Sequence, residues 1–240
     1  SPNTTIENNN IKNGIELLVS SNSNVINNNI NSTTIGADGI ELQLTHNSNI
    51  QNNVISMLGA LGRGLILISS NSNNITNNSI NHLGSLGRGI SLVPGSSSNK
   101  IYNNIIKTAN PQFNAESPIN NSWFISPLPG PNIVNGPFIG GNYWSGYNGV
   151  DLNGDGFGDT NIPYTSNGNM LSVDIYPLIN LSFSNLSIFS IPQIFILGQF
   201  SSQEFIATGG TPPYIWSLVN GTISNGMNFH SDGVINGTPT

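Results

Sequence analysis

The sequence predicts an all-β protein in which a right-handed parallel β-helix is followed by a small β-sandwich. Two observations predict the β-helix: an asparagine-rich block that recurs between Ile6 and Ile106, and a glycine-led block that recurs every 25 residues. A fixed period between about 20 and 50 residues is typical of solenoids and related repeat architectures. A third observation, a change of periodicity near residue 186, predicts the second unit.

The asparagine-rich block supplies the expected core. The pattern I-x-N-N-x-I and one shifted form of it occupy Ile6–Ile11, Val25–Ile30, Ile50–Ile55, Ile75–Ile80 and Ile101–Ile106. The apolar residues alternate with period two, and Asn, Gly and β-branched residues are poor helix formers. We therefore expect short strands with one inward column made of Ile6, Val25, Ile50, Ile75 and Ile101.

The glycine-led block adds a second set of strands. It begins at Gly14, Gly39, Gly64 and Gly89, and each glycine is followed by alternating apolar residues. Each coil of the predicted β-helix therefore contributes two or three strands to parallel sheets whose Ile, Val and Leu side chains point inward.

Five asparagines fall at one position of the repeat and predict a ladder: Asn9, Asn28, Asn53, Asn78 and Asn104. Asparagine tolerates left-handed turn geometry, and its side-chain amide can bond to the same residue of the next coil. We interpret the five residues as a hydrogen-bonded column at a turn of the β-helix.

Composition excludes several functions. Only 7% of the residues are charged, the net charge is −6, and the chain has five Lys and Arg residues in total. Binding to nucleic acid needs many such residues, so we expect no nucleic-acid partner. Cysteine is absent, which excludes disulfides and thiolate sites. We find no run long enough for a membrane span. Because Ser1-Pro2 opens inside a repeat, we expect the chain to be a piece of a longer protein.

The repeats resemble the NosD-like family of parallel β-helices, which is common in surface proteins of archaea and bacteria. The resemblance covers about residues 1–180 and is most specific in a closing segment at about 140–180. That segment contains Gly140-Gly141-Asn142-Tyr143-Trp144-Ser145 and Asp174-Ile175-Tyr176-Pro177-Leu178. The resemblance implies that it ends the β-helix, and Tyr143, Trp144 and Tyr147 suit a plug over the open end.

The closing segment also contains a candidate calcium loop. The pattern D-x-N-x-D-G-x-x-D places Asp151, Asn153, Asp155 and Asp159 at odd ligand positions, and Phe157 offers its carbonyl. Ile162 stands at the twelfth position, where such loops carry a bidentate Glu, so we assign Asp174 as the replacement ligand. The alternative is a solvated acidic turn without an ion.

Residues 186–240 resemble a bacterial and archaeal Ig-like surface repeat. The phrases that carry the resemblance are Gly209-Gly210-Thr211-Pro212-Pro213-Tyr214 with Trp216, and Gly237-Thr238-Pro239-Thr240. The resemblance implies a small Ig-like β-sandwich with Trp216 in its core. The family places one or more further strands after the last phrase, so we expect this sandwich to be incomplete, either truncated or completed by a strand from a neighbour.

We expect no active site. Glu16 and Glu41 align one coil apart, but Ile66 and Ser91 follow them at the same position. Polysaccharide hydrolysis needs paired carboxylates in one groove. Asp38, Arg63 and Arg88 also align; we interpret Asp38 and Arg63 as an ion pair, with Arg88 solvated or bonded to turn carbonyls.

We do not extend a copper role from the NosD-like family to this chain. The family name is tied to assembly of the copper site of nitrous oxide reduction. Met57 and Met170 are soft copper ligands in principle. The three histidines, His46, His82 and His230, are scattered and suggest no metal site.

Asparagine sequons are dense, and Asn31, Asn120, Asn185 and Asn220 are the best candidates for glycosylation. We therefore expect an extracellular or cell-surface protein of archaeal surface-layer, sheath or filament type. Its expected role is structural or adhesive, and its expected partners are other copies of itself, other surface proteins or surface glycans. The alternative is a carbohydrate-active enzyme or a glycan-binding β-helix, similar to polysaccharide lyases and hydrolases.

Overall fold

The structure is a computed structural model that describes residues 3–180, 187–189, 195–208 and 214–240. The chain forms two compact units, Ser1–Asn180 and Leu181–Thr240.

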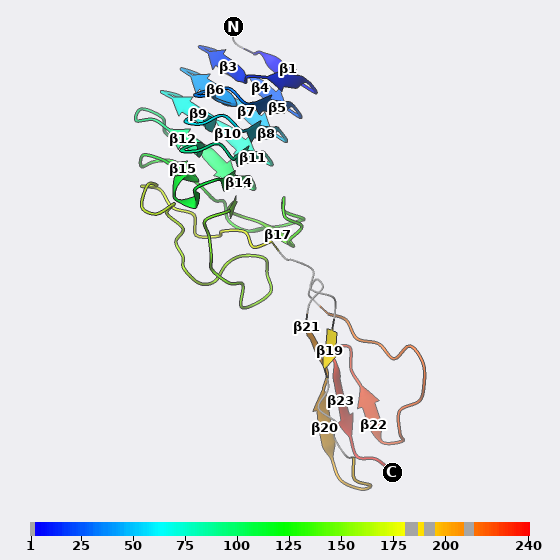
Figure 1. The fold of residues 1–240 in the computed structure, drawn as a ribbon. Helices are drawn as coiled ribbons and strands as arrows, with labels where there is room; N and C mark the ends of the chain where they lie inside the picture. Colours follow the sequence, from blue (N-terminus) through cyan, green and yellow to red (C-terminus); the bar gives the residue numbers. More distant parts are fainter. Residues whose placement is uncertain (1–2, 181–186, 190–194, 209–213) are drawn as a thin grey trace. The chain divides into compact units, whose positions relative to one another are not determined.

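The first unit is a parallel β-solenoid, as predicted (Figure 1). Three parallel sheets run along it, and each coil adds one strand to each sheet. The first sheet contains β1 (Thr5–Glu7), β4 (Asn24–Ile26), β7 (Asn49–Gln51), β10 (Asn74–Thr76) and β13 (Lys100–Tyr102). The second contains β2 (Asn10–Lys12), β5 (Asn29–Ser32), β8 (Val54–Met57), β11 (Ser79–His82), β14 (Ile105–Thr108) and β18 (Tyr143–Trp144). The third contains β3 (Ile15–Leu18), β6 (Ile40–Gln43), β9 (Arg63–Ile68), β12 (Arg88–Leu92) and β15 (Ala115–Glu116).

The predicted inward column is confirmed. In the first sheet Ile6 pairs with Val25, and the column continues through Ile50, Ile75 and Ile101. Val25 and the three isoleucines after it have no exposed surface. The other two sheets add aliphatic columns of their own, so the interior is filled by like side chains stacked on like side chains.

The repeated glycines are explained by close packing. A Cβ placed on Gly64 would lie 2.2 Å from Ile80 Cγ2 and 2.7 Å from the carbonyl oxygen of Gly89. Gly39 and Gly89 meet the equivalent isoleucine methyl groups, Ile55 Cγ2 and Ile106 Cγ2, at 2.4 Å. The backbone at this corner therefore lies directly against the isoleucine column of the second sheet and leaves no room for a side chain.

The five predicted ladder asparagines form one hydrogen-bonded column. In the last four of them the Oδ1 atom accepts two bonds from the asparagine of the preceding coil; Asn53 Oδ1, for example, accepts from the backbone N–H and the side-chain amide of Asn28 at 2.9 and 3.0 Å. The same pair of bonds recurs from Asn9 to Asn28, from Asn53 to Asn78 and from Asn78 to Asn104. The left-handed backbone belongs to the residue before each rung (Asn8, Asn27, Asn52, Asn77 and Asn103), and not to the rung itself.

Two further polar columns were not predicted. One contains Ser23, Ser48, Asn73, Asn99 and Asn121. From Ser48 onward, each side-chain oxygen accepts the backbone N–H of the column member one coil earlier. The other contains Ser20, Thr45, Ser70 and Ser96. The signal was available in the sequence, because small polar residues recur there at 25 or 26 residues as far as Asn99, but the mixture of Ser, Thr and Asn conceals it.

The second unit contains two small antiparallel sheets. β19 (Ser187–Phe189) pairs with β21 (Ile206–Thr208), and β23 (Val234–Gly237) lies between β20 (Ser201–Glu204) and β22 (Met227–Phe229). Trp216 is partly buried, and its ring lies 6.0 Å from that of Phe205. These strands suggest an Ig-like sandwich only loosely, and residues 209–213 of the characteristic phrase lie outside the described residues.

Replacing Asn53 by alanine is expected to lower the free energy of unfolding by about 1–3 kcal/mol, because buried donors of Asn28 and the carbonyl of Val25 lose their partner. Urea unfolding of the variant measures this cost. Asn29→Ala is the matched control: Asn29 is exposed, its amide bonds only to exposed Asn10, and we expect a change within about 0.5 kcal/mol. Equal stability of the two variants would contradict a structural role for the ladder.

Candidate functional site

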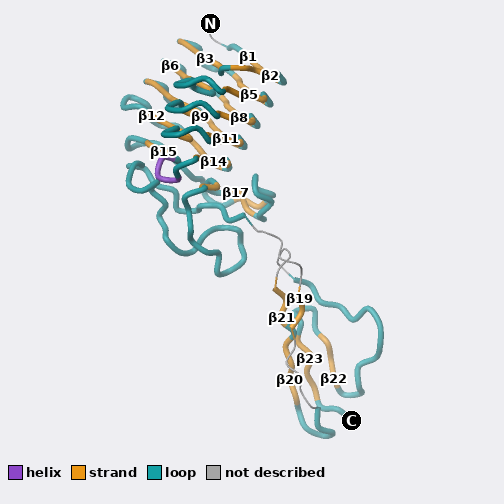
Figure 2. The backbone as a smooth tube through the Cα atoms, in the orientation of Figure 1, coloured by secondary structure: helices purple, strands orange, loops and turns teal. Residues whose placement is uncertain are grey.

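After β15 the chain stops repeating and builds a cap over the last coil, almost entirely from loops (Figure 2). The described elements of the cap are the hairpin of β16 (Leu128–Pro129) and β17 (Phe138–Ile139), and β18; the short helix η1 (Pro111–Phe113) lies just before β15. Through β18 the cap continues the solenoid: Trp144 pairs with Ile106, and Asn142 Oδ1 accepts from the backbone and side chain of Asn104 at 3.1 and 2.9 Å. The segment Asn142-Tyr143-Trp144 is therefore a last partial coil.

Asp174 ends the asparagine ladder. Its Oδ2 atom accepts the backbone N–H of Asn142 at 2.8 Å and the indole N–H of Trp144 at 2.9 Å, while Oδ1 accepts the backbone N–H of Tyr176 at 3.0 Å. The residue has no exposed surface. A carboxylate is suited to this position, because a final rung must accept hydrogen bonds and has no further coil to donate to.

An aromatic cluster surrounds this end of the core. Trp144 is 1% exposed, and its ring lies 4.8 Å from that of Tyr164 and 5.4 Å from that of Trp123. Tyr147 meets Tyr164 edge to face at 6.0 Å. The sequence indicated Tyr143, Trp144 and Tyr147 as plug residues; Trp144 and Tyr147 lie in this cluster, whereas Tyr143 packs against the separate cluster that contains Phe157. Trp123 and Tyr164 were missed because they belong to no motif, and only the path of the loops brings them here.

The acidic loop folds around its own backbone amides. Asp151 accepts the N–H groups of Gly154 and Gly156 at 2.7 and 2.8 Å, and Asp155 Oδ1 accepts that of Phe157 at 2.9 Å. Asp159 Oδ2 accepts the N–H of Leu152 at 2.7 Å. The side-chain amide of Asn153 lies between the carboxylates of Asp155 and Asp159, at 3.2 Å and 3.5 Å.

The assignment of Asp174 as a calcium ligand is wrong. Its carboxylate is buried in the cap and bonded to Asn142, Trp144 and Tyr176, so it belongs to the ladder and not to the acidic loop. Phe157 does lie in the loop, but its side chain is buried in the cap against Val134 and Leu178. Across the described ranges, no three side chains of His, Cys, Asp or Glu gather so that they could hold a metal ion.

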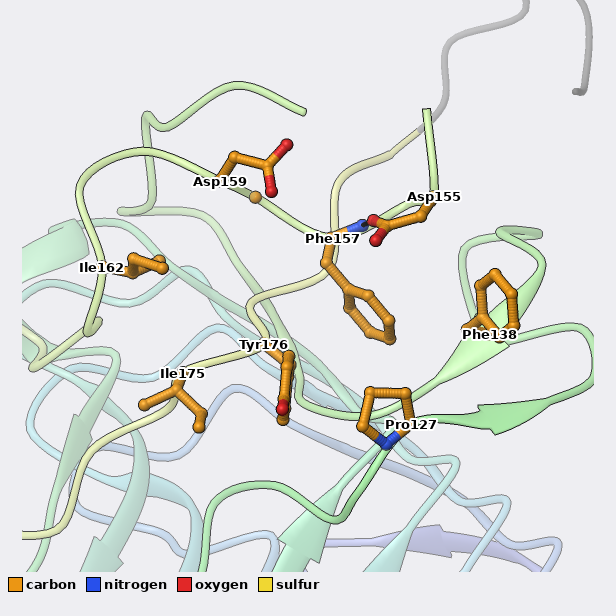
Figure 3. Close-up of a pocket in the computed structure, with 9 residues that line it drawn as sticks. Pro127, Phe138, Asp155, Phe157, Asp159, Ile162, Ile175 and Tyr176 are labelled. Atoms are coloured by element: carbon orange, nitrogen blue, oxygen red, sulfur yellow. Dashed lines mark hydrogen bonds between the residues drawn. The ribbon is translucent and has the colours of Figure 1, made fainter. Parts of the chain in front are cut away.

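A pocket opens beside the acidic loop (Figure 3). Its volume is about 220 Å³. Asp155 and Asp159 lie along one side of it, and the rings of Phe138, Phe157 and Tyr176 form much of the rest, together with Pro127, Gly158, Ile162 and Ile175. Aromatic rings beside carboxylates suit a ligand with both apolar and polar faces, such as a sugar.

The charged column along the third sheet differs in part from the prediction. Glu16 pairs in register with Glu41, and burial raises the pKa of Glu41, with Asp38 and Glu16 adding to the shift. The predicted ion pair of Asp38 and Arg63 is present at 3.6 Å. Arg88, however, is not merely solvated: its Nε lies 3.0 Å from Glu116, a residue that the sequence analysis missed.

Three of the predicted glycosylation sites, Asn31, Asn120 and Asn220, have exposed side chains. Asn185 lies outside the described residues. Exposure is necessary for modification but does not establish it, so glycosylation stays a prediction.

Comparison with known protein families shows which family the chain belongs to. The family described as periplasmic copper-binding protein (NosD) matches residues 1–149. The chain belongs to the NosD family. No curated protein and no solved structure matches it significantly. The matched residues cover all coils of the solenoid and end within the cap, so NosD membership and the parallel β-solenoid describe the same part of the chain.

The copper in the NosD description raises the question of which residues here fit that metal. Thioether and imidazole groups suit Cu(I), and no cysteine is present. Two of the residues considered above are neighbours on adjacent coils. Met57 and His82 pair in register on adjacent coils, both are buried, and both ring nitrogens of His82 lack hydrogen-bond partners. One thioether and one imidazole do not make up a copper site by themselves, and no group of three or more His, Cys, Asp or Glu side chains that could hold a metal occurs among the described residues, so we do not extend the copper role to this chain.

Asp174 is expected to make stability depend on pH between about 4 and 6. Burial raises the pKa of its carboxyl to about 6, although bonds from Trp144, Asn142 and Tyr176 oppose the shift. The unfolded chain releases this proton near pH 4, so in that interval the native form holds more protons and stability falls as pH rises. The full loss is about 3 kcal/mol for a shift of two units.

Urea unfolding between pH 4 and 7 measures this dependence. Asp174→Asn should flatten the profile relative to the unmodified protein, and the comparison between the two removes the contribution of Glu41, which has the same sign. Asp232→Asn, an exposed change in the other unit, should keep the original slope. An unchanged slope in Asp174→Asn would show that the cap carboxyl does not titrate in this range.

Proposed function

We propose that this NosD protein is a non-catalytic structural or adhesive component outside the cytoplasm, of the kind that builds a surface layer, sheath or filament. The observation that carries the proposal is the set of three hydrogen-bonded polar columns that join coil to coil within the solenoid. A protein whose corners are tied in this way resists bending and shear between coils, which is the property that a structural component needs.

The location rests on the family description. The family is described as periplasmic, which favours a role in the periplasm or at the cell surface. Within the described residues, no helix has the length and apolar character to cross a membrane. The exposed sequons at Asn31, Asn120 and Asn220 support a glycosylated surface, and the small antiparallel sheets support an Ig-like second unit.

The adhesive part of the proposal is supported by exposed leucines on the loops between the second and third sheets. Leu58 and Leu83 are each 57% exposed, and Leu61 and Leu86 are 54% and 57% exposed. The last two also have left-handed backbone, with φ of 67° and 58°, which is uncommon for a large side chain. Two stacked coils thus present four leucines to the outside, a surface suited to contact with another copy of the chain.

The alternative function, a glycan binder or carbohydrate-active enzyme, is favoured by one observation: the aromatic and acidic pocket beside the cap. Glu16 and Glu41 add a paired carboxylate on the third sheet. A panel of polysaccharides assayed for reducing ends and for unsaturated uronates separates the alternatives. We expect no product above the level of a blank, and robust turnover would overturn the non-catalytic assignment.

Self-association is the second test of the proposal. The double change Leu58→Ser and Leu83→Ser should weaken association of the chain about tenfold or more, because apolar area that is buried between copies is lost. Sedimentation velocity over a range of concentrations measures this. Leu152→Ser, a change of a leucine that is 73% exposed on the acidic loop, is the control. An unmodified protein that stays monomeric at high concentration would contradict contact between copies.

We also propose that calcium stabilises the acidic loop. The ligands would be the side chains of Asp151, Asn153, Asp155 and Asp159 and the carbonyl of Phe157, without Asp174. Calcium prefers six to eight oxygens, and an ion would replace some of the bonds that these side chains make to backbone amides. At 100 times its dissociation constant, calcium would add about 2.7 kcal/mol to the stability.

Melting curves with calcium and with a chelator test the ion. The unmodified protein should melt higher with calcium, Asp155→Ala should lose the gain, and Glu7→Gln, a change on exposed surface in β1, should keep it. Superimposable curves for the unmodified protein would reduce the motif to a self-bonded acidic turn.

A further inference from the structure

The starting observation is a short contact inside one Asn-Gly pair of the second unit. The backbone N–H of Gly221 donates to Oδ1 of Asn220, the residue directly before it, at 2.8 Å. Because a carbonyl bond is about 1.2 Å long, Cγ of Asn220 lies within about 4 Å of the Gly221 nitrogen. These are the two atoms that join when an asparagine side chain closes onto the backbone that follows it.

The surroundings of the pair leave these atoms free to move together. Asn220, Gly221 and Thr222 are all exposed. A Cβ placed on Gly221 would meet no atom within 4 Å. In the part of the chain that the structure describes, residues 217–223 make no backbone–backbone hydrogen bond, and Figure 1 shows the connection before β22 as a loop that stands away from the strands. Ring closure here therefore breaks no packing and no backbone ladder.

The chain contains eight Asn-Gly pairs, and the described contacts of the other seven differ from this one. In three of them another group accepts the glycine N–H: Gly136 donates to Asn132 at 2.8 Å, Gly154 to Asp151 at 2.7 Å and Gly168 to the carbonyl of Thr165 at 3.1 Å. A nitrogen that is held in this way must give up its hydrogen bond before it can attack, which slows the reaction.

In the remaining four pairs, hydrogen bonds hold the asparagine or its backbone elsewhere. The side-chain oxygens of three are bonded to other side chains: Asn13 to Ser32 and Thr34, Asn148 to Asn161, and Asn236 to His230. The pair Asn225-Gly226 forms the turn into β22, and its two carbonyls accept the N–H groups of Thr240 and Thr238. Asn220 is thus the asparagine whose own glycine is already at its side-chain carbonyl.

The chemistry at this pair needs only base and water. A base removes the proton of the Gly221 amide, and the nitrogen attacks Cγ of Asn220. The new N–Cγ bond forms, the Cγ–Nδ2 bond breaks, and ammonia leaves after taking a proton from solvent, which gives a five-membered succinimide ring. Water then opens the ring at one of its two carbonyls and yields aspartate or isoaspartate. Glycine favours the closure, because it has no Cβ to hinder the attack, and reacting atoms that are held close together react faster.

We propose that Asn220 is a site of spontaneous conversion to aspartate and isoaspartate, and that it reacts fastest among the eight Asn-Gly pairs of the native chain. Each event adds one negative charge to a chain whose net charge is −6. Conversion also destroys the glycan acceptor of the sequon Asn220-Gly221-Thr222, so a chain that is not glycosylated here loses the sequon with age. The structural role proposed above does not require this reaction, so the two proposals stand or fall separately.

The experiment follows the full chain, produced without glycans, during incubation at physiological temperature and neutral pH. Peptide mapping by mass spectrometry measures each asparagine separately, and a protein isoaspartate methyltransferase reports the isoaspartate product. We expect Asn220 to convert about fivefold faster, or more, than any other Asn-Gly pair, because its reacting atoms are already close. The rate should rise with pH, because the nucleophile is the deprotonated amide.

Three variants of the exposed loop test the chemistry. Asn220→Gln should stop conversion at this position, because the longer side chain cannot close the five-membered ring. Gly221→Ala should slow it about tenfold or more, because a Cβ hinders the nitrogen and disfavours the φ of +102°. Thr222→Ala is the matched control: it removes the sequon but keeps the Asn-Gly pair, and it should react like the unmodified chain.

Incubation in urea separates the effect of structure from that of sequence. In the unfolded chain every pair is released from its native contacts, so the eight rates should converge to within about threefold. The proposal is overturned if another pair reacts faster than Asn220 in the native chain, if the order and spread of rates are the same in urea, or if Gly221→Ala reacts as fast as the unmodified chain.

Discussion

The β-solenoid depends on one repeated interaction, the double hydrogen bond between an asparagine and the asparagine of the next coil. Asn53 shows why no other residue suffices: its oxygen accepts two bonds from Asn28, while its backbone N–H and amide donate to Asn78. Aspartate could not donate from its side chain, and a hydroxyl could not make all the bonds at once. Because the donors of the ladder find acceptors one coil away, a chain with few charges and a modest apolar fraction still orders its turns.

The ladder has a direction, and the direction places the candidate site. In the bonds from one asparagine to the next, the donors point toward later coils. The last rung therefore needs an acceptor that has no donor of its own to satisfy, and Asp174 provides it. The backbone of Asp174 pairs with Tyr164 of the aromatic cluster, and its carboxylate holds the N–H of Tyr176, whose ring lines the pocket. The pocket and the plug are therefore fixed to the solenoid through the same carboxylate that ends the ladder.

The interior corners divide into two kinds. At the asparagine, serine and threonine corners, polar side chains satisfy one another from coil to coil. At the corner between the second and third sheets, the column changes from serine to methionine, histidine and threonine, and the bonding is incomplete at His82. A repeat makes such an exception informative, because neighbouring coils show what a purely structural residue at that position would do.

The sequence by itself determined the solenoid: the 25-residue period, the isoleucine columns, the asparagine ladder and the ion pair of Asp38 with Arg63 all follow from residues that recur in register. Only the tertiary structure decided the role of Asp174, the partner of Arg88 and the place of Trp123 and Tyr164. The reason is that residues one period apart in the repeat are always neighbours in space. The cap has no such period, so its contacts depend on loop paths that no local pattern encodes.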